Sequence, residues 1–299
     1  MPSLIDIRRR IRSVKNTQQI TKAMKMVSAA KLRRAQDRAI ASRPYADMMS
    51  RILANATAAA ASDEEAGHLP LLQVREEKKI QLIVVSSDRG LAGPFNTNLF
   101  RQAQRFLDER RDTTIAIEAI GRKGRDYFRK RGYELTGEHI GIIERPTFEQ
   151  AKEIADRMID AYRKAELDAL YIATNEFKSV MAPNITLRKL LPVELPKEQK
   201  QEQASPDTEV NEKQQINYIY EQPPAELLGE LLPRYVEMGI YRAMLESNSA
   251  EHAARMTAMD TASSNAGDVI QTLTLNLNRV RQASITREII EIVSGAAAS

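Results

Sequence analysis

The sequence predicts an α/β domain inserted between two long helices that pair in an antiparallel coiled coil. Three observations carry this prediction. The first 57 residues after Pro2 contain no glycine, residues 252–280 hold a heptad repeat, and short apolar runs alternate with helical stretches between them. The expected architecture is a rod formed by both ends of the chain, with the α/β domain at its base.

The amino-terminal segment, residues 1–60, is predicted to be one long helix. Helix-forming residues dominate it, and its only internal proline is Pro44. Proline removes a backbone hydrogen bond, so the helix is expected to kink or divide near Arg43. Apolar residues predicted to form a coiled-coil seam recur at three and four residues: Leu4, Ile7, Ile11 and Val14. The stripe is then expected to resume with a phase shift at Ile20, Met24 and Val27.

The carboxyl-terminal segment, residues 223–299, carries a stricter pattern. Steps of four and three residues define an a/d seam of nine positions: His252, Met256, Met259, Ser263, Ala266, Ile270, Leu273, Leu277 and Val280. Small residues at two of these positions allow a partner helix to approach closely. Beyond the seam the apolar positions drift to Ile285, Ile289 and Ile292. Pro233 and Gly239 are expected to be able to break the start of this helix.

The middle of the chain, residues 75–222, reads as a Rossmann-like α/β domain. Buried strands are predicted at 78–88, 113–121 and 167–177, with helices at 96–110, 122–131 and 147–165. This alternation indicates a parallel sheet with helical crossovers. Residues 184–195 and 216–222 are expected to form a hairpin or to neighbour each other at a sheet edge. The polar stretch 196–215 is predicted to be a mobile loop.

Charge is distributed unevenly along the chain. Residues 1–51 hold 13 basic and three acidic residues, a net charge of +10, whereas the remaining 248 residues sum to −6. Such an arm suits nucleic acid, a membrane surface or an acidic protein partner. No aromatic residue that could stack on bases occurs in the first 44 residues. No apolar run is long enough to span a bilayer, and the start of the sequence lacks a secretory signal.

No catalytic constellation emerges from the sequence. The absence of cysteine excludes disulfides, thiolate metal sites and a thiol nucleophile. The loop SSDRGLAGPFNTN (86–98) follows a strand and opens a helix, yet it lacks the glycine pattern of phosphate-binding loops. The histidines His68, His139 and His252 are not spaced as metal ligands. We therefore expect no catalytic residue, no metal and no cofactor on this chain.

Three motifs resemble the gamma-subunit family of F-type ATP synthase. They are NTQQITKAMKMVSAAKLRRAQ (16–36), the loop at 86–98, and RQASITREIIEIVSGAA (281–297). The resemblance implies a central rotor whose coiled coil penetrates a hexamer of alpha and beta subunits. It implies that the α/β domain rests with the epsilon subunit on the membrane c-ring, one copy per complex, without nucleic acid. The absence of cysteine excludes the redox control of chloroplast members, and a place on the cytoplasmic face of a bacterial cell membrane is expected.

The resemblance also implies contacts with the catalytic head. Met24 and Lys25 are expected to face an acidic loop of the beta subunit, with Asp88, Arg89 and Ala92 near the same contact. Arg281 and Gln282 are expected to make polar catch contacts. The apolar residues Ile285, Ile289 and Ile292 suit a bearing at the top of the hexamer, because apolar contact is not directional.

Two other classes of function remain open from the residues alone. The basic arm would also suit a coiled-coil adaptor that tethers nucleic acid. The loop at 86–98 would also suit a nucleotide-dependent α/β enzyme. For the helices, pairing of each with a second copy of itself is the alternative to pairing within one chain.

Overall fold

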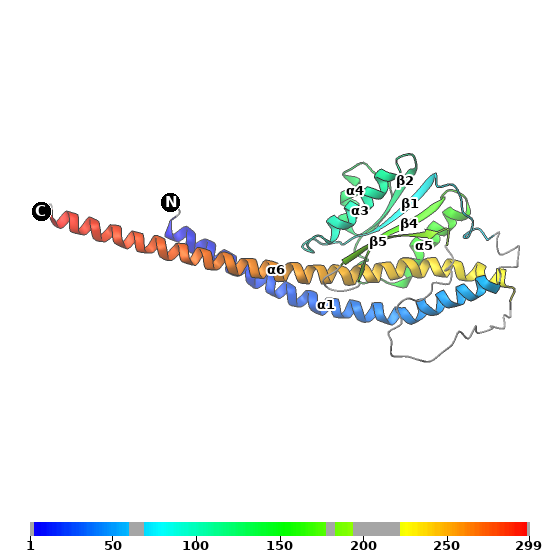
Figure 1. The fold of residues 1–299 in the computed structure, drawn as a ribbon, viewed down its shortest axis with the longest axis horizontal. Coiled ribbons are helices and arrows are strands. Elements are labelled where there is room, and N and C mark those ends of the chain that lie inside the picture. Colours follow the sequence, from blue (N-terminus) through cyan, green and yellow to red (C-terminus); the bar gives the residue numbers. More distant parts are fainter. Residues whose placement is uncertain (1–2, 60–68, 178–182, 194–221, 298–299) are drawn as a thin grey trace. The chain divides into compact units, whose positions relative to one another are not determined.

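The computed structural model describes residues 3–59, 69–177, 183–193 and 222–297 (Figure 1). It contains ten elements: α1 (Leu4–Ala59), β1 (Lys79–Val85), α3 (Phe95–Glu109), β2 (Thr114–Ile120), α4 (Arg122–Arg129), β3 (Leu135–His139), α5 (Phe148–Arg163), β4 (Ala169–Phe177), β5 (Pro183–Leu191) and α6 (Pro224–Ala297). The fold class expected from the sequence, an α/β domain between two long terminal helices, is confirmed. The loop predicted at 196–215, nearly all of the strand predicted at 216–222, and His68 lie outside the described residues.

The chain divides into two compact units. The first consists of the residues up to Lys31, the short segment Leu91–Gly93, and the residues from His252 onward. The second consists of Leu32–Gly90 and Pro94–Glu251. The long helices α1 and α6 each contribute to both units, so each helix is described below one unit at a time.

The second unit is built on a five-stranded sheet in the order β3-β2-β1-β4-β5. Strands β1, β2, β3 and β4 are parallel, as the helical crossovers predict, and β5 runs antiparallel to β4. Strand β3 was not predicted from the sequence. Its side chains at Thr136 and Glu138 are exposed, so this edge strand lacks the apolar run that marks a buried one.

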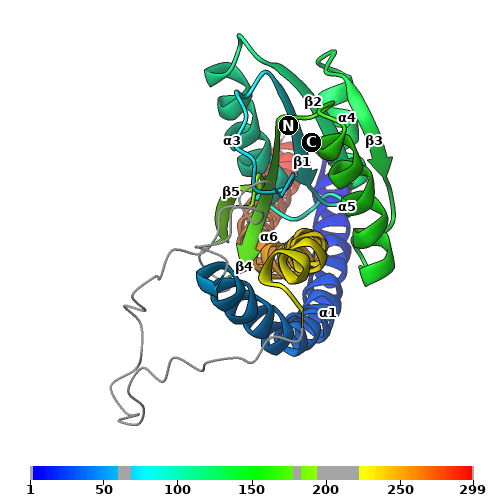
Figure 2. The same ribbon diagram turned by 90° about the vertical axis from the view of Figure 1, so that its right-hand side faces the viewer.

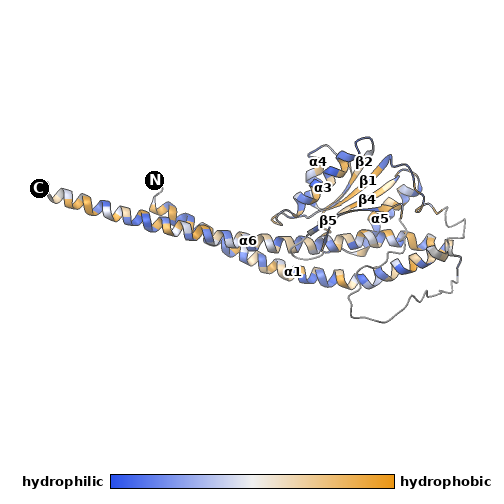
Figure 3. Cartoon of the chain, in the orientation of Figure 1, coloured by the Kyte–Doolittle hydropathy of each residue, from blue (hydrophilic) through white to orange (hydrophobic). Residues whose placement is uncertain are grey.

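Helices cover both faces of the sheet. Ile80, Leu82 and Val84 of β1 pack on the face covered by α3 and α4. Ile83 and Val85 point to the opposite face, where α5 and the unit's parts of α1 and α6 pack. Figure 2 shows α5 and α6 on the side of the sheet away from α3, and Figure 3 shows the hydrophobic character of the central strands. A strand covered on both faces is apolar throughout, which explains why β1 was readily predicted.

Prolines do not divide the long helices: the sequence predicted a kink or a division near Arg43, and the division is wrong. Pro44 lies inside α1 and Pro233 inside α6, and both helices continue through them; Gly239 does not break α6 either. At Pro44 the carbonyl that loses its backbone partner belongs to Ile40, which is exposed and can bond water. Around Pro233 the fully buried Leu232 and Val236 hold the helix in place by packing.

In the first unit, the two helices pair antiparallel within one chain. Thr21 Oγ1 lies 2.6 Å from Ser263 Oγ, and Gln18 Nε2 donates to the Ser263 carbonyl at 3.1 Å. Lys25 Nζ lies 2.6 Å from the Asp260 carboxylate. Because higher numbers in α1 meet lower numbers in α6, the helices run in opposite directions.

The predicted phase shift in the α1 stripe is wrong. Ile20 and Val27 are 59% and 57% exposed, whereas Thr21 and Ser28 are buried. The seam keeps its original phase after Val14 but continues through polar residues, which hydrophobic periodicity cannot detect. Ile20 and Val27, expected in the seam, instead lie on the outer face of the helix, whereas Met24 is half-buried.

Candidate functional site

The candidate functional site is the set of outward-facing side chains of the first unit. The Thr21–Ser263 contact fixes the register of the paired helices. Counting 17 residues from this contact toward the start of α1, and the same number toward the end of α6, places Leu4 opposite Val280. The residues of α6 after Val280 therefore extend beyond the start of α1 and have no paired helix in the described part of the chain.

This unpaired end of α6 carries exposed apolar side chains. We call residues 285–293 the α6 tip. Its members with exposed apolar side chains are Ile285, Ile289, Ile290, Ile292 and Val293, and Ile292 is 71% exposed. The seam of α6 up to Val280, by contrast, is buried or half-buried. Isolated apolar residues are common on protein surfaces, but five of them within nine residues at one helix end indicate a partner surface.

The outer face of α1 in the same unit is both basic and apolar. Residues 3–31 hold eight basic residues and one acidic residue. The same segment exposes four large apolar side chains: Ile5, Ile20, Met26 and Val27. Lys25, one of the expected contact residues, is half-buried in its ion pair with Asp260, and its neighbour Met24 is half-buried. Arg281 and Gln282 are exposed on α6, at the point where the pairing with α1 ends.

The expected contact residues of the 86–98 loop have differing environments. Asp88 accepts hydrogen bonds from the backbone amides of Arg122 at 2.9 Å and Gly141 at 3.0 Å. The Arg89 side chain is largely exposed, 3.9 Å from Glu144. Ala92 is 2% exposed and belongs to the first unit, so its side chain serves internal packing and is not available to a partner here.

The polar groups of this loop are used within the domain. Ser86 Oγ accepts from the Gly124 amide at 2.8 Å and donates to the Ile120 carbonyl at 3.0 Å. A Cβ on Gly121 would lie 2.2 Å from the Ser86 carbonyl oxygen, so only glycine fits there. The Asp88 carboxylate engages an amide at the start of α4, where a phosphate would otherwise bind. These contacts favour a structural role for the loop.

A buried charged cluster in the second unit was missed by the sequence reasoning. Glu118 of β2 is fully buried, and its carboxylate bonds His139 at 2.6 Å, Thr136 at 3.1 Å and Arg157 of α5. Burial opposes ionisation of Glu118, but the hydrogen bonds from His139 and Arg157 outweigh it, and the pKa is lowered from its usual 4.5. The available signal was a lone glutamate inside an otherwise apolar strand.

Within the described ranges, no group of three acidic or histidine side chains could hold a metal ion. Across the same ranges, no helix combines the length and apolarity needed to cross a bilayer.

Taken together, the fold and the exposed surfaces define a two-helix coiled-coil protein with an inserted α/β domain. The sequence profile described as ATP synthase matches residues 3–298. The ATP synthase gamma chain of Solibacter usitatus (strain Ellin6076) is 58% identical over 299 residues, which is 100% of both chains. That of Pelotomaculum thermopropionicum (strain DSM 13744 / JCM 10971 / SI) is 45% identical over 298 residues, covering 100% of this chain and 99% of the relative.

Solved structures share the fold. A chain of the Euglena gracilis mitochondrial ATP synthase in the OSCP/F1/c-ring assembly, rotational state 3, has a TM-score of 0.66 at 18% identity, covering 99% of this chain and 94% of the other. A chain of the Tetrahymena thermophila central stalk and c-ring has a TM-score of 0.59 at 22% identity, covering 82% and 99%. The chain belongs to the ATP synthase family as a gamma chain, the rotor-stalk subunit of F-type ATP synthase.

Proposed function

We propose that this chain couples ion-driven rotation of a membrane c-ring to ATP synthesis or hydrolysis in a head of alpha and beta subunits. In this proposal it has no active site and binds no cofactor. One copy works in each complex, together with an epsilon subunit and without nucleic acid, at the cytoplasmic face of a bacterial cell membrane. Each rotational angle of the coiled coil would favour one conformation of a catalytic subunit over the others.

The observation that carries this proposal is the α6 tip. The tip is the end of a long helix, it has no helix packed against it among the described residues, and it exposes five large apolar side chains. A surrounding sleeve of alpha and beta subunits would bury those side chains and stabilise the helix. Because apolar contact is not directional, the tip could turn inside such a sleeve without breaking fixed hydrogen bonds.

The polar contacts are proposed to lie just below the tip. Arg281 and Gln282 are exposed where the partner helix ends, so both side chains are free to reach loops of the catalytic subunits. On α1, the basic outer face beside Met24 and Lys25 would lie against an acidic loop of the beta subunit, although Lys25 itself is paired with Asp260 in this structure. Exposed ion pairs of this kind contribute about 1 kcal/mol or less each, so they would guide the rotor without holding it at one angle.

The experiment compares ATP hydrolysis with ATP-driven proton pumping by the assembled complex in membrane vesicles. The double variant Arg281→Ala/Gln282→Ala is expected to lower the protons pumped per ATP at least two-fold. Arg279→Ala, which changes an exposed arginine on the same helix, is the matched control and is expected to keep the normal ratio. Normal coupling in the double variant would contradict the proposal that Arg281 and Gln282 make polar contacts with loops of the catalytic subunits.

Deletion of residues 281–299 provides a harsher test. We expect weakened coupling or assembly, because the tip is lost, while the α/β unit stays folded, since none of its described core residues lies in this segment. A fully coupled complex carrying the deletion would contradict the proposal.

A further inference from the structure

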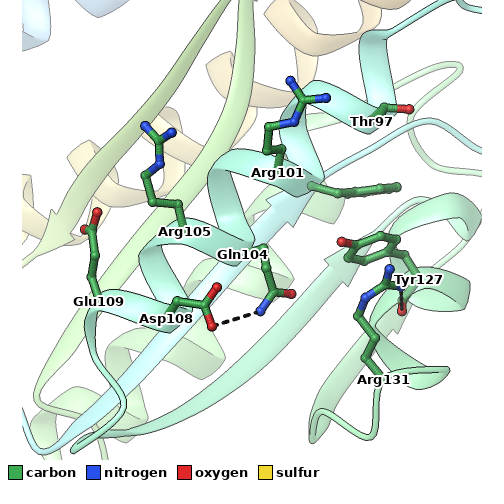
Figure 4. Close-up of a pocket in the computed structure, with 9 residues that line it drawn as sticks. Thr97, Arg101, Gln104, Arg105, Asp108, Glu109, Tyr127 and Arg131 are labelled. Atoms are coloured by element: carbon green, nitrogen blue, oxygen red, sulfur yellow. Dashed lines mark hydrogen bonds between the residues drawn. The ribbon is translucent and has the colours of Figure 1, made fainter.

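Two features lie outside the surfaces assigned above: a groove on the α/β unit and the exposed side chain of Leu91. The groove has a volume of about 810 Å³ and lies between α3 and α4 (Figure 4). Its Phe100 and Tyr127 rings stack on each other with centroids 4.4 Å apart, and its Arg101 and Arg105 are exposed to solvent. Among the described residues that line it, these groups select no single ligand. Leu91, by contrast, indicates a partner.

The backbone of Leu91, in the loop between β1 and α3, is strained. Its φ angle is +64°, in the left-handed region, where the Cβ atom of any residue except glycine is crowded. Ala165 also has a positive φ, but it follows α5, where a left-handed residue ends the helix and its amide bonds the Tyr162 carbonyl of the last turn. Leu91 ends no helix, so its conformation needs another explanation.

The side chain of Leu91 does not compensate for this strain within the chain. It is 64% exposed, so it buries little apolar surface in the folded chain. The next two residues anchor the loop, because Ala92 is 2% exposed and a Cβ on Gly93 would lie 3.6 Å from Ala258 Cβ of α6. The loop therefore holds Leu91 outward, at a cost in conformational free energy that the free chain does not recover.

Other exposed apolar side chains lie at the same level of the first unit. In the register of the paired helices, Met26 of α1 comes opposite Ala258 of α6, the residue on which Gly93 packs. Met26 is 68% exposed, and its neighbour Val27 is 57% exposed. At this level the unit therefore exposes apolar side chains both on α1 and on the loop beside α6. We call these three residues the apolar collar: Met26, Val27 and Leu91.

We propose that Leu91, with the rest of the apolar collar, contacts the head of alpha and beta subunits and forms a second apolar contact besides the α6 tip. This inference rests on the proposed function, which assigns the head as the partner of the tip. The collar belongs to the same compact unit as the tip. An apolar contact selects a protein surface over nucleic acid, which is bound mainly through its phosphates.

Two apolar contacts along one helix have a mechanical consequence. Ala258, at the level of the collar, and Ile289 of the tip are 31 residues apart on α6, which is about 46 Å. A shaft that is supported at two levels resists tilting, and because apolar contact is not directional, it can still turn. In this proposal the partner contact of Leu91 offsets the strain of its backbone in the assembled complex.

Photo-cross-linking in the assembled ATP synthase identifies the partner of Leu91. The chain has no cysteine, so Leu91→Cys, labelled before assembly, carries a single photoreactive maleimide. We expect a cross-linked product with an alpha or beta subunit, identified by mass spectrometry. Lys164→Cys, at an exposed residue of the α/β unit, is the control and should give no such product. Products of Leu91→Cys with epsilon or c subunits alone, or with no subunit, would overturn the proposal.

A glycine variant separates the backbone strain from the partner contact. Glycine adopts the left-handed region without strain, so the free Leu91→Gly chain should unfold at no lower urea concentration than the unaltered chain. Loss of the side chain should make the chain dissociate at least five-fold faster from a reconstituted head of alpha and beta subunits. Ala165→Gly relieves the same kind of strain without removing a large side chain, and as the matched control it should change the dissociation rate less than two-fold.

The outcomes distinguish this inference from the proposed function. Failure of the unaltered chain to bind the head would overturn both. If the unaltered chain binds and Leu91→Gly dissociates at the same rate, the inference alone is overturned. A lower urea midpoint for Leu91→Gly would also overturn it, because Leu91 would then stabilise the fold of its own chain.

Discussion

Glu118 shows how one side chain joins three elements of the α/β unit. Its carboxylate, fully buried in β2, is bonded by His139 of the edge strand β3 and by Arg157 of α5. Gly137 of β3 is part of the same fit, because a Cβ there would lie 2.2 Å from the Glu118 carboxylate. The contact of the polar edge strand β3 with the sheet is therefore stabilised by the Glu118 carboxylate, where a buried strand would use an apolar face.

This arrangement predicts a pH-dependent contribution to stability. The lowered pKa of Glu118 means that the folded state favours the ionised carboxylate. Its contribution is thus present above the usual pKa of 4.5 and is lost as the pH falls through the folded-state value. Glu118→Gln is expected to lower the free energy of unfolding by about 2 kcal/mol at pH 7. The difference from the unaltered chain should shrink below about pH 4.5.

Urea unfolding followed by tyrosine fluorescence measures this, because the chain has nine tyrosines and no tryptophan. Glu153→Gln changes an exposed glutamate on α5 and serves as the control, with an expected effect within about 0.5 kcal/mol at every pH. A loss in Glu118→Gln that stays constant from pH 7 down to about pH 3 would contradict the assignment.

At the scale of elements, the paired helices show which part of a coiled coil can be predicted from sequence. The α6 heptad is visible because most of its seam positions are apolar. In α1 the seam passes through Gln18, Thr21 and Ser28, so the visible apolar pattern shifts to residues on the outside of the helix. The polar seam residues Gln18 and Thr21 are explained only by the partner helix, since both are hydrogen-bonded to Ser263.

The same contact predicts a cross-link. Thr21→Cys/Ser263→Cys replaces two hydroxyls that lie 2.6 Å apart, so oxidation is expected to form an intramolecular disulfide. No native cysteine competes. Non-reducing electrophoresis followed by mass spectrometry of the digested chain checks the linkage. Thr21→Cys/Thr274→Cys, displaced by eleven residues or about 16 Å along α6, should not cross-link within one chain.

A disulfide between two chains in the Thr21→Cys/Ser263→Cys variant would instead support pairing of each helix with a second copy. This outcome would contradict the intrachain register on which the α6 tip depends.

For the whole molecule, the order of helices, strands and long termini was predictable apart from the edge strand β3, but the partner surfaces were only partly so. The sequence predicted that Arg281, Gln282, Ile292 and Ala92 all contact the catalytic head. Only the structure shows that the first three are exposed and that Ala92 is buried. Buried networks such as that of Glu118 join residues far apart in the chain, and one sequence gives no measure of such distances. The unpaired state of the α6 tip likewise follows only from a register that depends on contacts between the two ends.

The tip gives a prediction at this scale. In the free chain, backbone amides of residues 285–297 are expected to exchange hydrogen with solvent at least ten-fold faster than those of residues 256–280, because no helix of the described ranges packs against residues 285–297. In the assembled ATP synthase the tip should become protected. Hydrogen exchange read by mass spectrometry checks both states, and strong protection of the tip in the free chain would contradict the proposed sleeve.

The contact between Thr21 and Ser263 spans 242 positions of the sequence. For a flexible chain, closing so large a loop costs about 5 kcal/mol of entropy, which the folded middle domain reduces by restricting the intervening residues. A ribosome makes the first helix early and its partner last. Until the α6 seam has been synthesised, therefore, α1 has no partner helix, and the intrachain coiled coil can form only after that.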